Sequence, residues 1–88
     1  MSNTWILTSN GELYGCGGNI EGELGLGDKT RVLTFTKCAE NVKKVRCSPG
    51  TTWYIDNNNN LYGCGSNMYG QQGSNSTSDV LTFTKRDL

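Results

Sequence analysis

The chain has 88 residues, of which 34% are hydrophobic, and its eight Lys and Arg balance eight Asp and Glu. This length allows one small domain with a modest core, because a chain of this size buries only about 60–65% of the surface that its unfolded form exposes. Neutral charge argues against a dedicated nucleic-acid binder, whose affinity depends on neutralising phosphates. No apolar stretch reaches the roughly 18 residues of a membrane-spanning helix, and the N-terminus lacks the pattern of a signal peptide. We therefore expect an intracellular, cytoplasmic protein with no membrane partner.

The first predicted element is a β-hairpin. Residues 5–8 and 13–17 are short β-like runs separated by a turn at Asn10-Gly11. This dipeptide is typical of a primed two-residue turn, which needs positive φ at both central residues. A second hairpin is predicted around Asn58-Asn59, because Asn tolerates the left-handed conformation better than other residues with a side chain.

A long connection follows each hairpin, at residues 18–31 and 66–79. Glycines recur at matching places in the two connections, namely Gly22 and Gly25 in the first, and Gly70 and Gly73 in the second. Their recurrence predicts fixed turns with positive φ. The first connection resembles a phosphate-binding loop only superficially, since Asp28 stands where the lysine should be, so no nucleotide cofactor is expected.

Three further strands complete the pattern. Residues 32–36 and 80–84 alternate apolar side chains with Thr, as half-buried strands do. Residues 42–47 form another alternating run, with Val45 and Cys47 predicted on one face and basic side chains on the other. With the turn that follows and the two hairpins, this predicts seven strands, and no segment has helical periodicity.

The chain is an internal repeat. Residues 4–37 and 52–85 align without a gap at an interval of 48 residues, and 17 of the 34 aligned positions are identical. A period of this size, with turn residues between short apolar runs, is typical of β-propeller blades. We therefore predict an all-β fold of two antiparallel propeller blades, as a single two-repeat unit over residues 1–88 with an inner-strand linker at 38–51.

Two motifs resemble a known repeat. Residues 13–27 read LYGCGGNIEGELGLG, residues 61–73 read LYGCGSNMYGQQG, and the linker VKKVRCSPGTTW joins them. Together they resemble the regulator of chromosome condensation repeat, whose full-length members carry about seven blades in one chain. The chain departs from the family pattern at Cys16 and Cys64, which stand where Trp is usual, and at Glu23 and Gln72, which stand in the usual Gln-Leu pair. These departures predict altered packing between blades.

The resemblance implies several functions rather than one. Members of the family act as exchange factors for Ran-type GTPases, as partner-binding domains of ubiquitin ligases, as photoreceptors and as secreted inhibitors, and such functions depend on surface residues grafted onto the blades. No catalytic residue is expected, because the chain has no His and its first-repeat acidic residues do not recur in the second. We expect a non-enzymatic protein-interaction scaffold. The alternatives are an exchange-factor-like binder of a small GTPase and a glycan-binding propeller that uses Trp5, Trp53 and Tyr69.

The four cysteines are Cys16, Cys38, Cys47 and Cys64. Their spacing contains no Cys-x-x-Cys pair, and no His could complete a zinc site. We expect reduced, buried thiols that pack as small hydrophobic groups, in preference to a disulfide or a metal centre. No metal or other cofactor is predicted.

The long connections are the predicted partner-binding regions, because variable loops on a rigid scaffold often carry function. Met68 and Tyr69 replace Ile20 and Glu21 of the first repeat and form the most anchor-like pair, an aromatic beside a flexible apolar side chain. These four positions are the candidate binding residues.

The last prediction concerns assembly. Residues 1–3 are too few to supply an inner strand for the first repeat, and two isolated blades would leave apolar faces and strand edges in water. We expect the chain to close a ring with copies of itself, with three chains giving six blades or four giving eight. The competing interpretation is a fragment of a longer propeller. An unknown protein is the alternative or additional partner that we expect.

Overall fold

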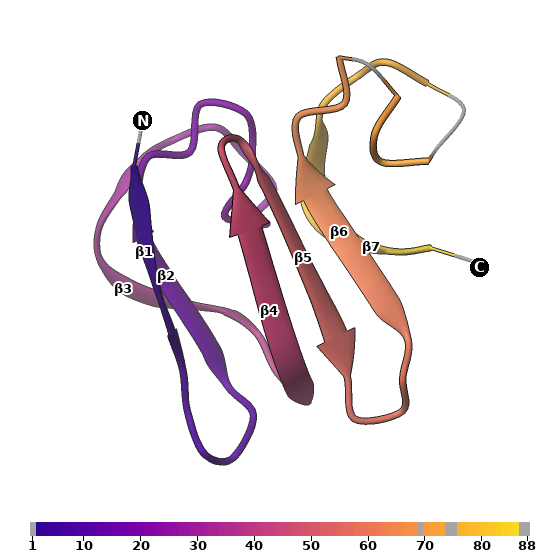
Figure 1. Cartoon of the computed structure of the whole chain (residues 1–88). Helices are drawn as coiled ribbons and strands as arrows, with labels where there is room; N and C mark the ends of the chain where they lie inside the picture. The colour runs from indigo at the N-terminus through magenta and orange to yellow at the C-terminus, as the bar shows by residue number, and fades with distance from the viewer. Residues whose placement is uncertain (1, 69, 74–75, 87–88) are drawn as a thin grey trace.

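The structure is a computed structural model that describes residues 2–68, 70–73 and 76–86, and in these residues it contains seven β-strands and no helix. Figure 1 labels the strands, which are Asn3–Leu7 (β1), Leu13–Gly17 (β2), Val32–Ala39 (β3), Val42–Ser48 (β4), Thr51–Asp56 (β5), Leu61–Gly65 (β6) and Val80–Arg86 (β7). The prediction of an all-β chain with seven strands is confirmed. None of the described segments is a helix that could cross a membrane.

The strands form two antiparallel sheets, which lie side by side (Figure 1). The first sheet has the order β1-β2-β3, and the second has the order β4-β5-β6-β7. The linker predicted at 38–51 supplies β4, which pairs with β5 through matches such as Val45 opposite Tyr54. In the described residues β1 has no equivalent partner on its outer side, so the first blade lacks the fourth strand that completes the second.

Both predicted hairpins are present, but the primed turn is wrong. Only Gly11 in the first turn and Asn59 in the second have positive φ, at 87° and 65°. Gly11 N donates to Thr8 O at 3.1 Å, and Thr8 N donates to Glu12 O at 2.9 Å. This is a three-residue loop between the paired Thr8 and Glu12, with one left-handed residue at its end, a common alternative to the two-residue turn. The longer loop is favoured because a side chain at its first position caps it, as the Thr8 hydroxyl does by accepting from Glu12 N at 2.9 Å.

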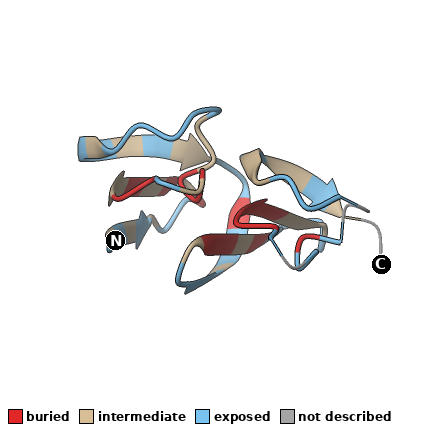
Figure 2. Ribbon diagram, turned by 90° about the horizontal axis from the view of Figure 1, so that it is seen from above, coloured by how far each residue is buried: buried red, intermediate tan, exposed pale blue. Residues whose placement is uncertain are grey.

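The core lies where the two sheets face each other. Its buried hydrophobic centre is Leu13 of β2, Val42 of β4 and Tyr54 of β5. Five half-buried side chains pack around this centre, namely Trp5, Ala39, Val45, Tyr62 and Phe83. Figure 2 shows the buried residues concentrated on the central strands and on the loop between the sheets. The core therefore belongs to the joint between the blades, and neither blade has a core of its own, as expected for a stacked repeat.

The cysteine prediction is confirmed only in part. All four cysteines are free, and Cys64 is fully buried, whereas Cys16 and Cys38 are half-buried. Cys47 is exposed, which contradicts the expectation that it packs inward beside Val45. The reason is its place near the end of β4, an edge strand of the second sheet that pairs with a neighbour on one side only.

Candidate protein-interaction site

The connection of the first repeat, residues 18–31, is built around one buried asparagine. Asn19 is inaccessible to solvent, and its Oδ1 accepts a hydrogen bond from Leu24 N at 2.9 Å. Its Nδ2 donates to Asp28 O and to Thr30 O, each at 3.0 Å. A single amide near the start of the loop thus satisfies backbone groups in its middle and near its end, which holds the loop in one shape.

The connection of the second repeat, residues 66–79, has the same internal skeleton. Asn67 is also inaccessible, its Oδ1 accepts from Gln72 N at 2.9 Å, and its Nδ2 donates to Ser76 O at 2.8 Å. The recurring glycines all have positive φ, as predicted, at 78° and 70° for Gly22 and Gly25 and at 72° and 67° for Gly70 and Gly73. The two loops therefore fold alike because their sequences carry the same asparagine and the same left-handed glycines.

The first loop is docked on the second sheet. Gly27 N donates to Leu81 O of β7 at 2.8 Å, and Leu26 forms an isolated antiparallel bridge with Thr82. Thr52 Oγ1 of β5 donates to Glu23 O at 2.7 Å. These backbone and hydroxyl contacts attach the loop of one blade to the strands of the next.

Close approach of side chains to glycine completes the joint. A Cβ atom at Gly22 would lie 2.5 Å from Leu81 Cδ2, and one at Gly25 would overlap the Phe83 ring. Phe83 also meets Trp5 edge-on, with ring centroids 6.5 Å apart, and meets Tyr54 in the same manner at 4.8 Å. Only glycine leaves room for these two side chains, so the recurring glycines serve both the turn and the contact.

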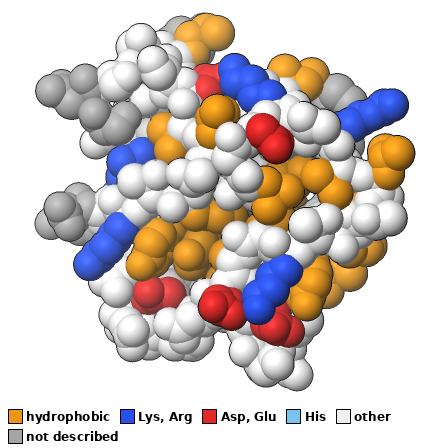
Figure 3. Space-filling model, turned by 180° about the vertical axis from the view of Figure 1, so that it is seen from behind, with side chains coloured by type: hydrophobic (Ala, Val, Ile, Leu, Met, Phe, Trp, Pro, Cys, Tyr) orange, Lys and Arg blue, Asp and Glu red, His pale blue; other side chains and the backbone are white. Residues whose placement is uncertain are grey.

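The second loop has no such neighbour. Among the described residues, no atom lies within 4 Å of a Cβ atom built at Gly70 or at Gly73. Strand β3, which is the first-repeat counterpart of β7, is equally uncovered, with Leu33 80% and Phe35 46% exposed. Figure 3 shows hydrophobic side chains gathered on the face seen from behind. The chain thus has two open ends, one on each blade.

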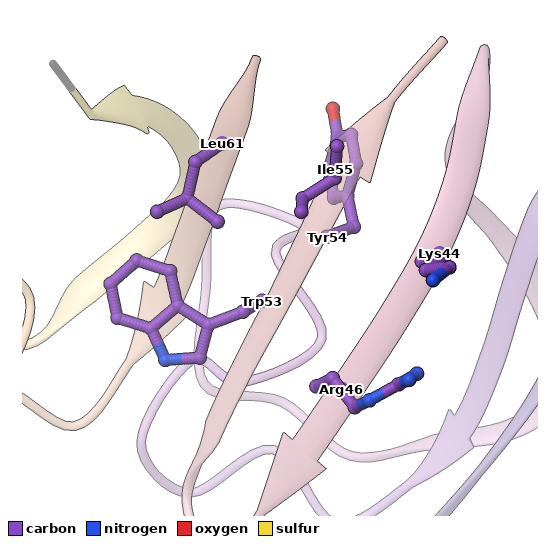
Figure 4. A pocket seen from close by; sticks show the side chains of 6 residues that line it. All are labelled: Lys44, Arg46, Trp53, Tyr54, Ile55 and Leu61. Atoms are coloured by element: carbon purple, nitrogen blue, oxygen red, sulfur yellow. The ribbon is translucent and has the colours of Figure 1, made fainter. Parts of the chain in front are cut away.

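An apolar cavity of about 170 Å³ opens on the second blade, between residues of β4, β5 and β6. Its apolar lining is Trp53, Tyr54 and Ile55 of β5 with Leu61 of β6. Figure 4 shows the Trp53 indole extending toward β6 beside Leu61, with the basic side chains of β4 at the other border. Trp53 is half-buried at this cavity, whereas its counterpart Trp5 packs at the joint.

The predicted binding residues belong to the two long loops, and three of the four lie among the described residues. Ile20 and Met68 are exposed, at 56% and 66%, and they occupy matching places on two loops one repeat apart. Glu21 is half-buried, and its backbone N donates to Glu23 Oε1 at 2.9 Å. Tyr69 lies outside the described residues. Ile20 and Met68 are exposed apolar side chains and remain candidate binding residues.

Sequence reasoning missed Leu33, Phe35 and Leu61. They lie in strands whose alternation predicts half-burial, and nothing in one strand shows which face lacks a neighbour. The repeat alignment contained the signal, because Leu33 and Phe35 match Leu81 and Phe83, which pack against the preceding loop. With no blade in the described residues to supply that loop, the first copy of the strand stays open.

Three of the cysteine thiols and the phenol of Tyr54 have raised pKa values. Burial raises the pKa of the Cys64 thiol strongly and raises that of Cys38 to about 11. Partial desolvation of the Cys47 sulfur also raises the pKa of that thiol. Burial also raises the pKa of Tyr54 to about 12. Thiols with raised pKa values are poor nucleophiles at neutral pH. In the part of the chain that the structure describes, no group of three His, Cys, Asp or Glu residues could hold a metal ion.

Comparison with known proteins supports the fold. No protein-family profile and no curated protein matches the chain. The crystal structure of human WBSCR16 is similar to the chain over its whole length, with a TM-score of 0.89 and 26% sequence identity. The chain spans 24% of the length of that protein's chain. The molecule is all-β, and its two antiparallel sheets resemble two blades of a β-propeller.

Proposed function

We propose that the chain is a non-enzymatic protein-interaction scaffold of the β-propeller class, completed by copies of itself in a closed ring. The observation that supports this proposal is the exposure of Leu33 and Phe35, at 80% and 46%, in a strand whose second copy is packed against a loop. Apolar side chains that stay in water on a repeat unit are typical of a surface that stacks on a further unit.

The ring follows from the two ends being different. A contact that joins unlike surfaces propagates from chain to chain, and it ends only when the rotation closes. Three chains would give six blades and four would give eight, both within the usual range of propellers. The resemblance to the regulator of chromosome condensation repeat is consistent with a propeller, and a partner protein would bind the loops at the rim of the ring.

Mass in solution tests this function. We expect light scattering coupled to size-exclusion chromatography to give about 29 or about 38 kDa, three or four times the chain mass of 9.6 kDa. A folded species of 9.6 kDa at every concentration from micromolar to millimolar would contradict self-assembly.

A glycan-binding function is the second candidate, because Trp53 is accessible at an apolar cavity bordered by Lys44 and Arg46. Aromatic rings next to polar groups can stack on sugars. A glycan array read with the intact chain, with Trp53→Ala as the control, tests this candidate. Absence of a signal that depends on Trp53 would dismiss it.

A further inference from the structure

We infer that the cavity beside Trp53 and the glycines of loop 66–79 receive strand β3 of a second copy of this chain, in a head-to-tail contact. This inference rests on the proposed self-assembly and specifies its two surfaces. It is argued from the joint inside the chain, which shows how one blade of this sequence packs against the next.

The internal joint provides the pattern of contacts. Phe83 of β7 lies over Gly25 and meets the Trp5 ring edge-on at 6.5 Å. Leu81 lies over Gly22, and Tyr54 packs with Leu13 in the buried core. Each pair joins a residue of the first blade, at its loop or its Trp5 face, to a residue of the second sheet.

Moving the first member of each pair forward by one repeat gives the open surface of the second blade. The interval of 48 residues takes Trp5, Gly22, Gly25 and Leu13 to Trp53, Gly70, Gly73 and Leu61. All four of these positions are at the open loop or at the cavity beside Trp53. Leu61 is half-buried where Leu13 is fully buried, as expected for the same site without its cover.

Moving the second member of each pair back by one repeat gives the exposed side chains of the first blade. Phe83, Leu81 and Tyr54 correspond to Phe35, Leu33 and Ile6. Their exposed fractions are 46% for Phe35, 80% for Leu33 and 45% for Ile6. The strand that carries Leu33 and Phe35 reads VLTFTK in both repeats, so the docking side chains are unchanged.

The receiving surface is already formed. Gly70 N donates to Asn67 O and Gly73 N donates to Gly70 O, both at 3.0 Å, as the matching groups do in the docked loop. The φ values of the two loops agree within about 6° at the matched glycines. Preformed surfaces bind with a smaller entropic cost. The cavity, at about 170 Å³, is of the size that holds a benzene ring in a protein interior, about 150 Å³.

The basic residues at the cavity border do not oppose this contact. Lys44 and Arg46 belong to β4, the fourth strand of the second sheet. The first sheet of the incoming copy has only three strands and no counterpart of β4 that would cover them. A second copy would therefore leave these two side chains in water while its Phe35 and Ile6 cover the apolar lining. No buried unpaired charge is created, which would cost several kcal/mol.

Complementary variants test the contact. In the strand variant, Leu33→Ser and Phe35→Ser remove the inserting side chains. In the loop variant, Gly73→Asn places a side chain where the Phe35 ring must lie. Asn is chosen because Asn41 and Asn59 adopt φ of 61° and 65° in this chain, close to the 67° of Gly73. Circular dichroism of each variant at low concentration checks that it is folded.

We expect each variant to be monomeric where the unmodified chain assembles, because loss of an aromatic anchor weakens an interface about 30-fold or more. An equimolar mixture should give a dimer of about 19 kDa, twice the chain mass of 9.6 kDa, because each variant keeps the surface that the other has lost. A mixture that stays monomeric would overturn the inference, as would assembly of either variant at the concentration that suffices for the unmodified chain.

Tryptophan fluorescence gives a second measurement. Trp5→Phe leaves Trp53 as the one indole, and its quenching by acrylamide should decrease several-fold as the concentration is raised into the assembled range. Trp53→Phe leaves Trp5, which the chain itself covers, and its quenching should not change. If the unmodified chain stays monomeric, self-assembly fails. If it assembles while Trp53 stays equally accessible, self-assembly stands and this interface is wrong.

Discussion

The two long loops have nearly the same sequence signals and the same internal hydrogen bonds, yet one is docked and the other is open. In residues 18–31 the glycines lie under Leu81 and Phe83, while in residues 66–79 the matching glycines have no described atom within 4 Å of a built Cβ atom. The conformation of each loop is thus a local property, set by its asparagine and glycines. Whether the loop contributes to a core depends on the blade beside it.

The largest difference between the two ends is expected from Phe83→Ala and its matched control Phe35→Ala. Phe83 contacts Trp5, Tyr54 and the backbone of Gly25, so its truncation should lower the free energy of unfolding by about 3 kcal/mol, the low end for a core aromatic because Phe83 is half-buried. Phe35→Ala should cost well under about 1 kcal/mol in the monomer. Urea unfolding at low protein concentration measures the free energy of unfolding of both variants. Equal losses would show that β3 and β7 contribute equally to the monomer, against the prediction.

The two buried asparagines, Asn19 and Asn67, give a second test of the difference between the docked loop and the open loop. Asn19→Ala and Asn67→Ala each remove an amide that hydrogen-bonds two or more backbone groups within its loop. We expect Asn19→Ala to cost about 2 kcal/mol, because its loop is part of the joint and buried backbone groups lose their partners. Asn67→Ala should cost clearly less, since the open loop can refill with water. Thermal unfolding compares the stabilities of the two variants. A larger loss of stability for Asn67→Ala than for Asn19→Ala would contradict the conclusion that docking of the first loop adds to the stability of the fold.

Alkaline pH should act on the joint through Tyr54. Its pKa is raised by burial from the ordinary 10.0 to about 12. The unfolded chain therefore loses this proton first, so the stability that the neutral phenol contributes is complete below pH 10.0 and is lost as the pH rises toward about 12. Tyrosinate absorbance followed with circular dichroism measures this. Tyr54→Phe should remove part of the decline, and an unchanged pH profile would count against Tyr54 as its source.

The smallest effect is expected at Gln72. It stands where the first repeat has the buried Leu24, and its Oε1 is buried without a hydrogen-bond partner among the described residues. Its Nε2 donates to Cys64 O at 3.0 Å. Gln72→Leu removes the unpartnered oxygen and loses this bond, so we expect a gain of at most about 1 kcal/mol. Differential scanning calorimetry would detect it, and a loss above that size would show that the Nε2 bond dominates.

Much of the fold could be predicted from the sequence. Seven alternating runs separated by Asn and Gly turns predicted seven strands, and the left-handed glycines were correctly placed at Gly22, Gly25, Gly70 and Gly73. The primed turn was predicted wrongly. The capping side chains at the ends of the hairpin strands favour a longer loop than the Asn-Gly pair alone suggests. Turn type depends on local chemistry, and here the capping side chain had a larger effect than the Asn-Gly dipeptide.

The candidate site was harder to predict. Strands β3 and β7 share the same six residues, VLTFTK, so their sequence cannot show which copy is exposed. The sequence alone determined the repeat, the strands and the shape of each loop, since these depend on neighbours within a few residues or on the period of the chain. Only the tertiary structure decided that Leu81 and Phe83 are covered while Leu33 and Phe35 are not. The physical reason is that burial belongs to a pair of blades, and identical side chains gain or lose it according to which neighbour is present.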